Sequence, residues 1–224
     1  ADGITSTTIL KRFFKDRGVD VSCYIPNRLT EGYGMNQDAI KKIAEEGTKL
    51  IITVDTGITA IEEVKLAKEL GMDVIVTDHH EQAEEIPDAI AVVDLKRKDS
   101  KEYPFRDLCG AGVAFKLCMA LCKELDLKED EALKYIIFAA IGTIADVMPL
   151  IDENRTIVKF GLMLLARPKY IGIVELTKAS DIIASRTYDY FFPLILVAII
   201  YLIITLGLSK GVQKLERKLN HVRS

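Results

Sequence analysis

Two short β-branched runs separated by an amphipathic segment place the strongest constraint on how this chain folds. The runs are Leu50–Val54 and Val74–Thr77, and the segment between them is Thr59–Leu70, with apolar residues recurring at helical spacing. Strand, crossover helix and strand form a βαβ unit, and the right-handed connection of such units makes the two strands parallel. The sequence therefore predicts an α/β fold built on a parallel sheet.

Polar residues follow both predicted strands at the point where each strand ends. Asp55 follows the first strand, and Asp78, His79 and His80 follow the second. Parallel strands place their carboxyl ends at one edge of the sheet, where open α/β sheets bind their ligands. Carboxylate and imidazole groups are also metal ligands, and two of the chain's three histidines are adjacent here. We therefore predict a metallohydrolase site at this edge.

Each of these residues also has an ordinary structural interpretation. An aspartate after a strand is often a helix N-cap or a turn former, and this applies to Asp55. Asp78 is expected to orient its neighbours rather than to bind metal. A single histidine beside an apolar run is more often structural than a ligand. The paired histidines and two carboxylates together favour the metal site, whereas the pattern around Asp146 predicts only a helix end.

Several segments, spread from residue 1 to about residue 170, occur with the residues and in the order of a known enzyme family. They are Ala1–Ser6, Tyr24–Arg28, Glu31–Asn36, Val54–Gly57, Val76–Glu81, Cys109–Lys116 and Ile141–Leu150. On these segments the chain resembles the DHH phosphoesterases, and most closely the RecJ-type exonucleases of that family.

The resemblance implies a site with two metal ions, Mn²⁺ or Mg²⁺. Such a site hydrolyses phosphodiester bonds of single-stranded DNA from the 5′ end, in DNA repair and recombination. By this likeness Asp55 bridges both ions, His79 and Asp146 bind one of them, and His80 contacts the scissile phosphate. The residue types suit that chemistry, because carboxylate oxygens bind hard divalent ions and an imidazole adds affinity for manganese.

The family's first motif is only partly present. It reads Asp-x-Asp-Ala-Asp-Gly and follows the first strand of the family's sheet, whereas this chain begins at the alanine of the motif. Asp2 is the third aspartate and is expected to support the site or to cap a helix beginning near Thr5. The first two aspartates, which resemble family metal ligands, are not in the sequence. We therefore expect the chain, taken as a fragment of the catalytic module, to bind Mn²⁺ weakly and to degrade single-stranded DNA poorly.

The loop from Asn27 to Gly34 is a further candidate for substrate contact. It carries Arg28, Glu31 and two glycines, and a guanidinium group matches the geometry of a phosphate. Arg28 is therefore predicted to contact the substrate, and the alternative is an ordinary glycine-rich turn. The basic triplet at residues 96–98 is expected to be a solvated loop, and the alternative is a contact with DNA.

The remaining pattern completes one catalytic domain over residues 1–172, which is long enough for a single core. Further strands are predicted at Val19–Ile25 and Ile90–Val93, with the first run extending back to Lys49 and the second to Asp73. Further helices are predicted at Thr5–Arg17, Asn36–Glu46, Gly110–Glu124, Asp130–Ala145 and Glu153–Ala166. Cys23, Cys109, Cys118 and Cys122 show no metal-binding spacing and are expected to be reduced core residues, as in a cytoplasmic protein.

The C-terminus changes character after a junction at residues 173–189. Residues 190–209 carry no charge, and as a helix they would span about 30 Å, the thickness of the hydrocarbon core. We predict a transmembrane helix there, with a basic cytoplasmic tail at residues 210–224; the alternative is a buried core helix. The tail has a net charge of +4, which leaves −7 on residues 1–209 because the whole chain carries −3. Any DNA binding would therefore depend on metal and a local groove rather than on a broad basic face.

The tail also resembles a second family. The segments that look like the end of an ABC-transporter permease for polar amino acids are Glu175–Thr187, Ile200–Leu202, Leu208–Ser209 and Leu215–Leu219. A span with a cytoplasmic C-terminus would place the acidic head outside the cell, although the head is expected in the cytoplasm and no export signal is visible. Our hypothesis is a composite chain, joined near Tyr170–Glu175.

Three functions therefore follow from the sequence. The first is the metal-dependent exonuclease, favoured by Glu31–Gly34 and Cys109–Lys116. The second is a DHH phosphodiesterase of short oligonucleotides or cyclic dinucleotides. The third is a transport-system subunit, which depends on the tail alone.

Overall fold

A parallel sheet with the strand order β1-β2-β3 organises the fold in the computed structural model. The structure describes residues 1–26, 32–99, 103–128 and 130–165, all within the unit Ala1–Arg167. In chain order the elements are α1 (Asp2–Lys15), α2 (Gln37–Glu45), β1 (Leu50–Ile52), α3 (Ile61–Glu69), β2 (Asp73–Asp78), β3 (Ala91–Asp94), α4 (Gly110–Glu124), α5 (Asp130–Leu133), α6 (Ile136–Ala145) and α7 (Asp152–Leu165). The strands pair in parallel, with Ile52 opposite Ile75 and Asp78 opposite Asp94. The predicted α/β fold is confirmed, and α3 is the predicted crossover helix.

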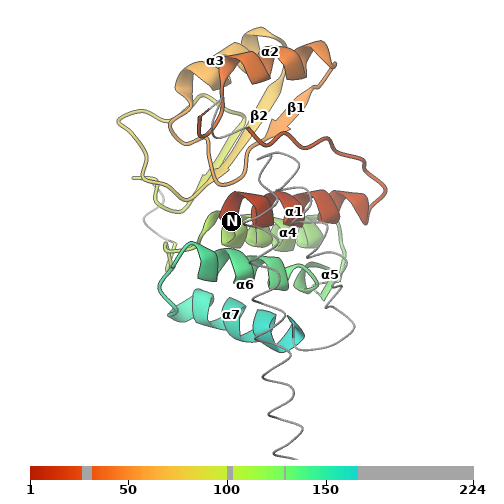
Figure 1. Ribbon diagram of the computed structural model, residues 1–224, viewed down its shortest axis with the longest axis vertical. Coiled ribbons are helices and arrows are strands. Elements are labelled where there is room, and N and C mark those ends of the chain that lie inside the picture. The colour runs from red at the N-terminus through yellow and green to blue at the C-terminus, as the bar shows by residue number, and fades with distance from the viewer. Residues whose placement is uncertain (27–31, 100–102, 129, 166–224) are drawn as a thin grey trace, which may run out of the picture. The chain divides into compact units, whose positions relative to one another are not determined.

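The two faces of the sheet bury different side chains, because side chains alternate along a strand. Val74 and Val76 of β2 are buried on one face, in a cluster with Ile40 of α2 and Val64 of α3. On the other face, Ile52 of β1 packs against the core formed by the N-terminal and C-terminal helices. Helices therefore cover both faces, as the continuous apolar strands of a parallel sheet require (Figure 1).

The helical part of the unit consists of α1, α4, α6 and α7, which lie side by side (Figure 1). Ile9 and Phe13 of α1 are buried with Phe115 of α4 in one continuous apolar cluster. A Cβ added to Gly161 of α7 would overlap the Cβ of Ala140 in α6, so the glycine allows these two helices to approach closely. This packing fixes the end of α6, where Asp146 lies.

Three of the buried residues are cysteines, as predicted. Cys109, Cys118 and Cys122 are buried in the helical core, none in a disulfide, and Cys23 is partly buried. Burial raises the pKa of the Cys118 thiol to about 12, so it stays un-ionised and behaves as a small apolar side chain.

Two sequence-based predictions about elements are wrong. Val19–Ile25 does not form a strand, because a strand needs a hydrogen-bonded ladder and the described sheet is made of β1, β2 and β3 only. The helix predicted over Asp130–Ala145 is broken into α5 and α6. At the break, the Nζ of Lys134 lies 2.9 Å from Asp16 and the Tyr135 hydroxyl donates to Asp16 at 2.7 Å. A contact with a residue so distant in the chain leaves no trace in apolar periodicity.

Several predictions concern residues beyond those described. The junction at 173–189, the span at 190–209, the basic tail at 210–224 and Arg28 all lie outside the described residues. Among the helices that the structure does describe, none has the length and apolar character needed to cross a bilayer.

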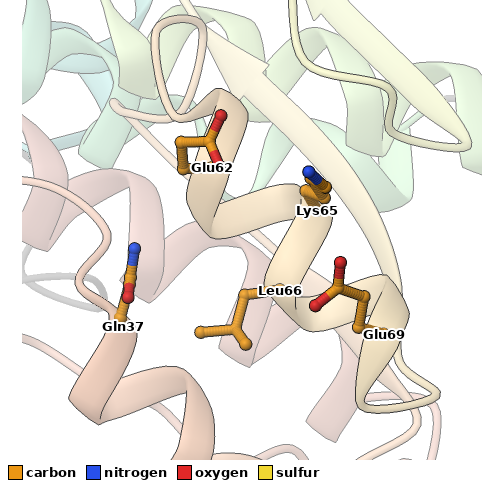
Figure 2. Close-up of a pocket in the computed structure, with 5 residues that line it drawn as sticks. All are labelled: Gln37, Glu62, Lys65, Leu66 and Glu69. Atoms are coloured by element: carbon orange, nitrogen blue, oxygen red, sulfur yellow. The ribbon is translucent and has the colours of Figure 1, made fainter.

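A groove of about 210 Å³ lies between α2 and α3 (Figure 2). It is lined by Gln37, Glu62, Lys65, Leu66 and Glu69. None of the site residues predicted from the sequence lines this groove, so the candidate site lies elsewhere in the unit.

Candidate metal centre

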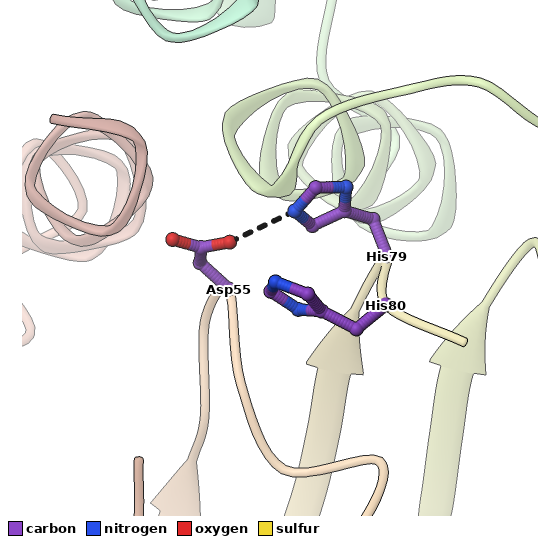
Figure 3. Close-up of side chains that lie close together, drawn as sticks. All are labelled: Asp55, His79 and His80. Atoms are coloured by element: carbon purple, nitrogen blue, oxygen red, sulfur yellow. Dashed lines mark hydrogen bonds and ion pairs between the residues drawn. The ribbon is translucent and has the colours of Figure 1, made fainter. Parts of the chain in front are cut away.

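The predicted metal-binding residues converge on the Nε2 atom of His79. Asp55, which follows β1, points toward His79 and His80, which follow β2 (Figure 3). The His79 Nε2 atom lies 3.0 Å from an oxygen of Asp55, 3.7 Å from one of Asp2 and 3.8 Å from one of Asp146. Residues far apart in the sequence therefore place three carboxylates around one imidazole nitrogen.

Asp55 reaches this position through a turn with unusual backbone geometry. Its φ is 58°, in the left-handed region, which costs a non-glycine residue about 1–3 kcal/mol. The Thr53 hydroxyl donates to the Thr56 carbonyl at 2.7 Å, and the Thr77 hydroxyl donates to the Thr53 carbonyl at 2.6 Å. These bonds hold the ends of β1 and β2 together and keep the turn in place.

Asp78 contacts the backbone N–H of His79 and the imidazole ring of His80. One of its oxygens lies 2.7 Å from the Nδ1 atom of His80 and accepts the backbone N–H of His79 at 2.8 Å. Its other oxygen accepts the backbone N–H of Ile58 at 2.9 Å. Since a carboxylate accepts, the proton of this pair lies on Nδ1 of His80. The contacts agree with the orienting role predicted for Asp78.

Asp2 lies at the start of α1, but its carboxylate contacts a different helix. The backbone N–H groups of Gly110 and Ala111 donate to it at 2.6 and 2.9 Å, at the N-terminus of α4. Of the two roles predicted for Asp2, the cap of its own helix is therefore wrong, because α1 begins at Asp2 itself and has no side-chain cap. The other role, support of the site, stays a prediction. The carboxylate is buried between α4 and His79, where a helix N-terminus favours negative charge.

The crowding of carboxylates changes the protonation of the cluster. Burial alone would lower the pKa of His79, but the hydrogen bond to Asp55 and the charges of Asp55, Asp2 and Asp146 outweigh it, and the pKa is raised. The pKa of Asp2 is raised by burial and by the charge of Asp55, although the N–H groups of Ala111 and Gly110 oppose the shift. The cluster therefore attracts positive charge.

The residues fit a divalent metal ion. Ligand atoms of Asp55, His79 and His80 lie within 4.8 Å of one another, and so do those of Asp2, His79 and Asp146. His79 belongs to both groups, so the two groups of ligand atoms lie side by side at this edge of the sheet. Carboxylate oxygens with one or two imidazoles are a donor set for Mn²⁺ or Mg²⁺.

Sequence reasoning missed two residues that shape the site. The Tyr33 hydroxyl donates to the Asp55 carbonyl at 2.7 Å. A Cβ added to Gly110 would lie 2.7 Å from the Cβ of Asp55, so only glycine fits there. Tyr33 belongs to the family-like segment Glu31–Asn36, and Gly110 belongs to Cys109–Lys116. The order of residues in these segments does not show which atoms Tyr33 and Gly110 contact in the fold.

Comparison with known proteins identifies the family. The DHH family, N-terminal domain, matches residues 1–143. The chain is 52% identical over 180 residues to the single-stranded-DNA-specific exonuclease RecJ of Bacillus subtilis, covering 80% of this chain and 22% of that protein. It is 42% identical over 179 residues to RecJ of Thermus thermophilus, covering 80% of this chain and 26% of that protein.

A solved structure shows the same fold. The crystal structure of an exonuclease RecJ bound to manganese matches with a TM-score of 0.68 and 39% identity, covering 85% of this chain and 48% of that one. The chain spans about a quarter of the length of the curated relatives. The sequence match over residues 1–143 and the shared fold show that the chain belongs to the DHH family.

Proposed function

We propose that this chain carries the catalytic centre of a metal-dependent exonuclease that hydrolyses phosphodiester bonds of single-stranded DNA. The observation that supports it is the convergence of Asp55, Asp2 and Asp146 on His79. The similar RecJ proteins are named as single-stranded-DNA-specific exonucleases, and one is described as bound to manganese. Removal of nucleotides from the 5′ end, a role in DNA repair and recombination, and a domain boundary near residue 172 are parts of the same proposal.

In this proposal each residue has a distinct task. Asp55, His79 and Asp146 would hold Mn²⁺ or Mg²⁺, with Asp55 between the two metal positions. Bound ions would activate water and stabilise the leaving oxygen. Asp78 lies 2.7 Å from Nδ1 of His80 and orients its half-exposed ring, which supports the proposal that His80 would contact a phosphate oxygen. Arg28 is proposed as a further substrate contact.

The experiment follows Mn²⁺-dependent release of nucleotides by the 224-residue chain from 5′-labelled and 3′-labelled oligonucleotides. Single-stranded DNA, duplex DNA and a cyclic dinucleotide are compared under the same conditions. Because two aspartates of the family's first motif are not in this sequence, the proposal expects slow release of products. They should come from the single strand only, by degradation from the 5′ end. Preferred hydrolysis of the cyclic dinucleotide would instead support the alternative DHH phosphodiesterase. A Lys98→Ala variant is the matched control, because the Lys98 side chain donates to a surface carbonyl, that of Ala83, and its loss should leave the rate unchanged.

Binding of Mn²⁺ should strengthen as pH rises from 6.0 to 7.5. The pKa of His79 in the fold is raised above its usual 6.5, so the imidazolium is present at pH 6.0 and is lost as pH rises through the raised pKa. A metal ion competes with that proton, and displacement of one proton gives at most about tenfold in affinity per pH unit. Isothermal titration calorimetry at both pH values measures this. The free energy of unfolding of the metal-free chain should fall over the same rise in pH, because the imidazolium that stabilises the fold is lost. Equal Mn²⁺ affinity at both pH values would contradict the prediction.

For the tail, we propose that residues 190–209 cross a membrane and that Ser224 lies on the cytoplasmic side. The support is the uncharged stretch followed by Lys210, Lys214, Arg217 and Lys218, which are costly to translocate. A reporter fused to residues 174–224 should insert in that orientation. Labelling of a unique cysteine at Ser224, with the four native cysteines removed, measures it, and a variant with the four basic residues changed to glutamine should lose the preference.

The same assay on the full chain tests the conflict in topology between the head and the tail. Export of the acidic head without a signal would compete with insertion, so we expect aggregation, proteolysis or an inverted span. Uniform insertion with a folded head outside the cell would show that the head and the tail are compatible.

A further inference from the structure

Tyr33 connects the loop before α2 to the turn that carries Asp55. Its hydroxyl donates to the Asp55 backbone carbonyl at 2.7 Å, across 22 residues of sequence. Its ring meets the ring of His80 edge to face, with centroids 6.1 Å apart and an interplanar angle of 74°. One side chain therefore touches both the turn that carries Asp55 and the ring of His80.

The Asp55 turn needs such a contact because its backbone is in a conformation that aspartate rarely adopts. Asp55 has a φ of 58°, in the left-handed region, and this conformation sets the direction of its carbonyl group. The Thr53 hydroxyl donates to the carbonyl of Thr56, the residue after Asp55. The carbonyl of Asp55 itself accepts a hydrogen bond from the Tyr33 hydroxyl. Loss of this hydrogen bond would leave the orientation of the Asp55 carboxylate less restricted.

The loop is built to approach this turn closely. Gly34 has a φ of +88°, and a Cβ added there would lie 3.1 Å from the Thr56 hydroxyl oxygen. Gly32 has a φ of +79°, so the two residues that flank Tyr33 both adopt backbone conformations that favour glycine. The two glycines allow the Tyr33 hydroxyl to reach the Asp55 carbonyl, while Tyr33 remains 60% exposed.

We infer that Tyr33 is a positioning residue of the metal centre, which sets the Asp55 carboxylate for metal binding through its hydroxyl group. The inference rests on the proposed function, because it concerns the same metal site. It gives Tyr33 a role in orienting a metal ligand that is independent of any contact between this loop and the substrate.

The test is Tyr33→Phe in the 224-residue chain, which removes the hydroxyl and keeps the ring. Loss of one hydrogen bond that orders a ligand should raise the dissociation constant for Mn²⁺ about fivefold. Free Mn²⁺ is measured by electron paramagnetic resonance during titration, with thermal unfolding of the metal-free protein as the measure of structure. The midpoint of unfolding should stay close to that of the wild type, and in the nuclease assay kcat should fall with KM unchanged.

Tyr103→Phe is the matched control, because the Tyr103 hydroxyl donates to Glu153 at 3.0 Å, away from the cluster. It should leave Mn²⁺ affinity unchanged. Wild-type affinity in Tyr33→Phe, or an equal loss in both variants, would overturn the inference. Weak binding in Tyr33→Ala together with normal binding in Tyr33→Phe would also overturn it, since the ring rather than the hydroxyl would then matter. Failure of the wild-type chain to bind Mn²⁺ would overturn the proposed function and this inference together.

Discussion

Replacing His79 by alanine should weaken Mn²⁺ binding by roughly a hundredfold or more, since loss of residues that merely support a metal ligand already costs 10–100-fold. The physical reason is that His79 is the centre of the cluster. Its Nε2 atom lies 3.0 Å from Asp55 and within 3.8 Å of Asp2 and Asp146. Without the imidazole, the ion loses a nitrogen ligand, and Asp55 loses the hydrogen-bond partner that lies 3.0 Å from its oxygen.

A comparison with His80→Ala sharpens this prediction. His80 is half exposed and is proposed to contact the phosphate, so its removal should reduce turnover while retaining most of the Mn²⁺ affinity. Titration of Mn²⁺ by calorimetry and nucleotide release are measured for both variants. If His79→Ala binds Mn²⁺ as well as the wild type does, the cluster around Nε2 is not the metal centre.

Replacing Gly110 by alanine should both destabilise the fold and damage the metal centre. The added Cβ would lie 2.7 Å from the Cβ of Asp55, 2.9 Å from its Cα and 3.0 Å from an oxygen of Asp2. Two of these atoms belong to the strained turn and one to the carboxylate that accepts the N–H of Gly110 at 2.6 Å. The backbone must shift, and overpacking of this kind costs about 1–3 kcal/mol in the free energy of unfolding.

Gly112→Ala is the matched control on the same helix. Its Cβ would lie 3.2 Å from the Cβ of Leu108, remote from Asp55, and an alanine inside a helix gains up to about 1 kcal/mol over glycine. Chemical denaturation and Mn²⁺ titration of both variants decide the matter. The expected result is a loss of stability and of Mn²⁺ affinity in Gly110→Ala only. Equal effects of the two substitutions on Mn²⁺ affinity would contradict the close contact between α4 and the Asp55 turn.

The pairing of Asp55 with His79 could be predicted from the sequence because it follows from local patterns. Two apolar runs and one amphipathic helix determine a parallel βαβ unit, and the residues after its strands must share an edge. The position of Asp146 could not be derived in this way and came only from a family resemblance. The position of Asp146 depends on how α6 packs against α1. This packing is close at Gly142, where an added Cβ would lie 2.6 Å from a carboxylate oxygen of Asp2 and 2.8 Å from the Thr5 hydroxyl oxygen.

The role of Asp2 illustrates the limit of pattern reasoning more sharply. Its position near the start of a helix predicted a cap for that helix, yet its carboxylate accepts N–H groups from α4, more than a hundred residues away. Tyr33 is a similar case, since a side chain on an exposed loop gives no periodic signal. Such contacts depend on tertiary packing, and the same is true of the break between α5 and α6.

The central claim is tested most directly by X-ray diffraction from crystals soaked in Mn²⁺, with anomalous data collected near the manganese absorption edge. Our account predicts an anomalous peak within bonding distance of the Asp55 and Asp146 carboxylates and the His79 Nε2 atom, and its loss in crystals of His79→Ala. A fully occupied Mn²⁺ elsewhere, with no density between these three side chains, would contradict it.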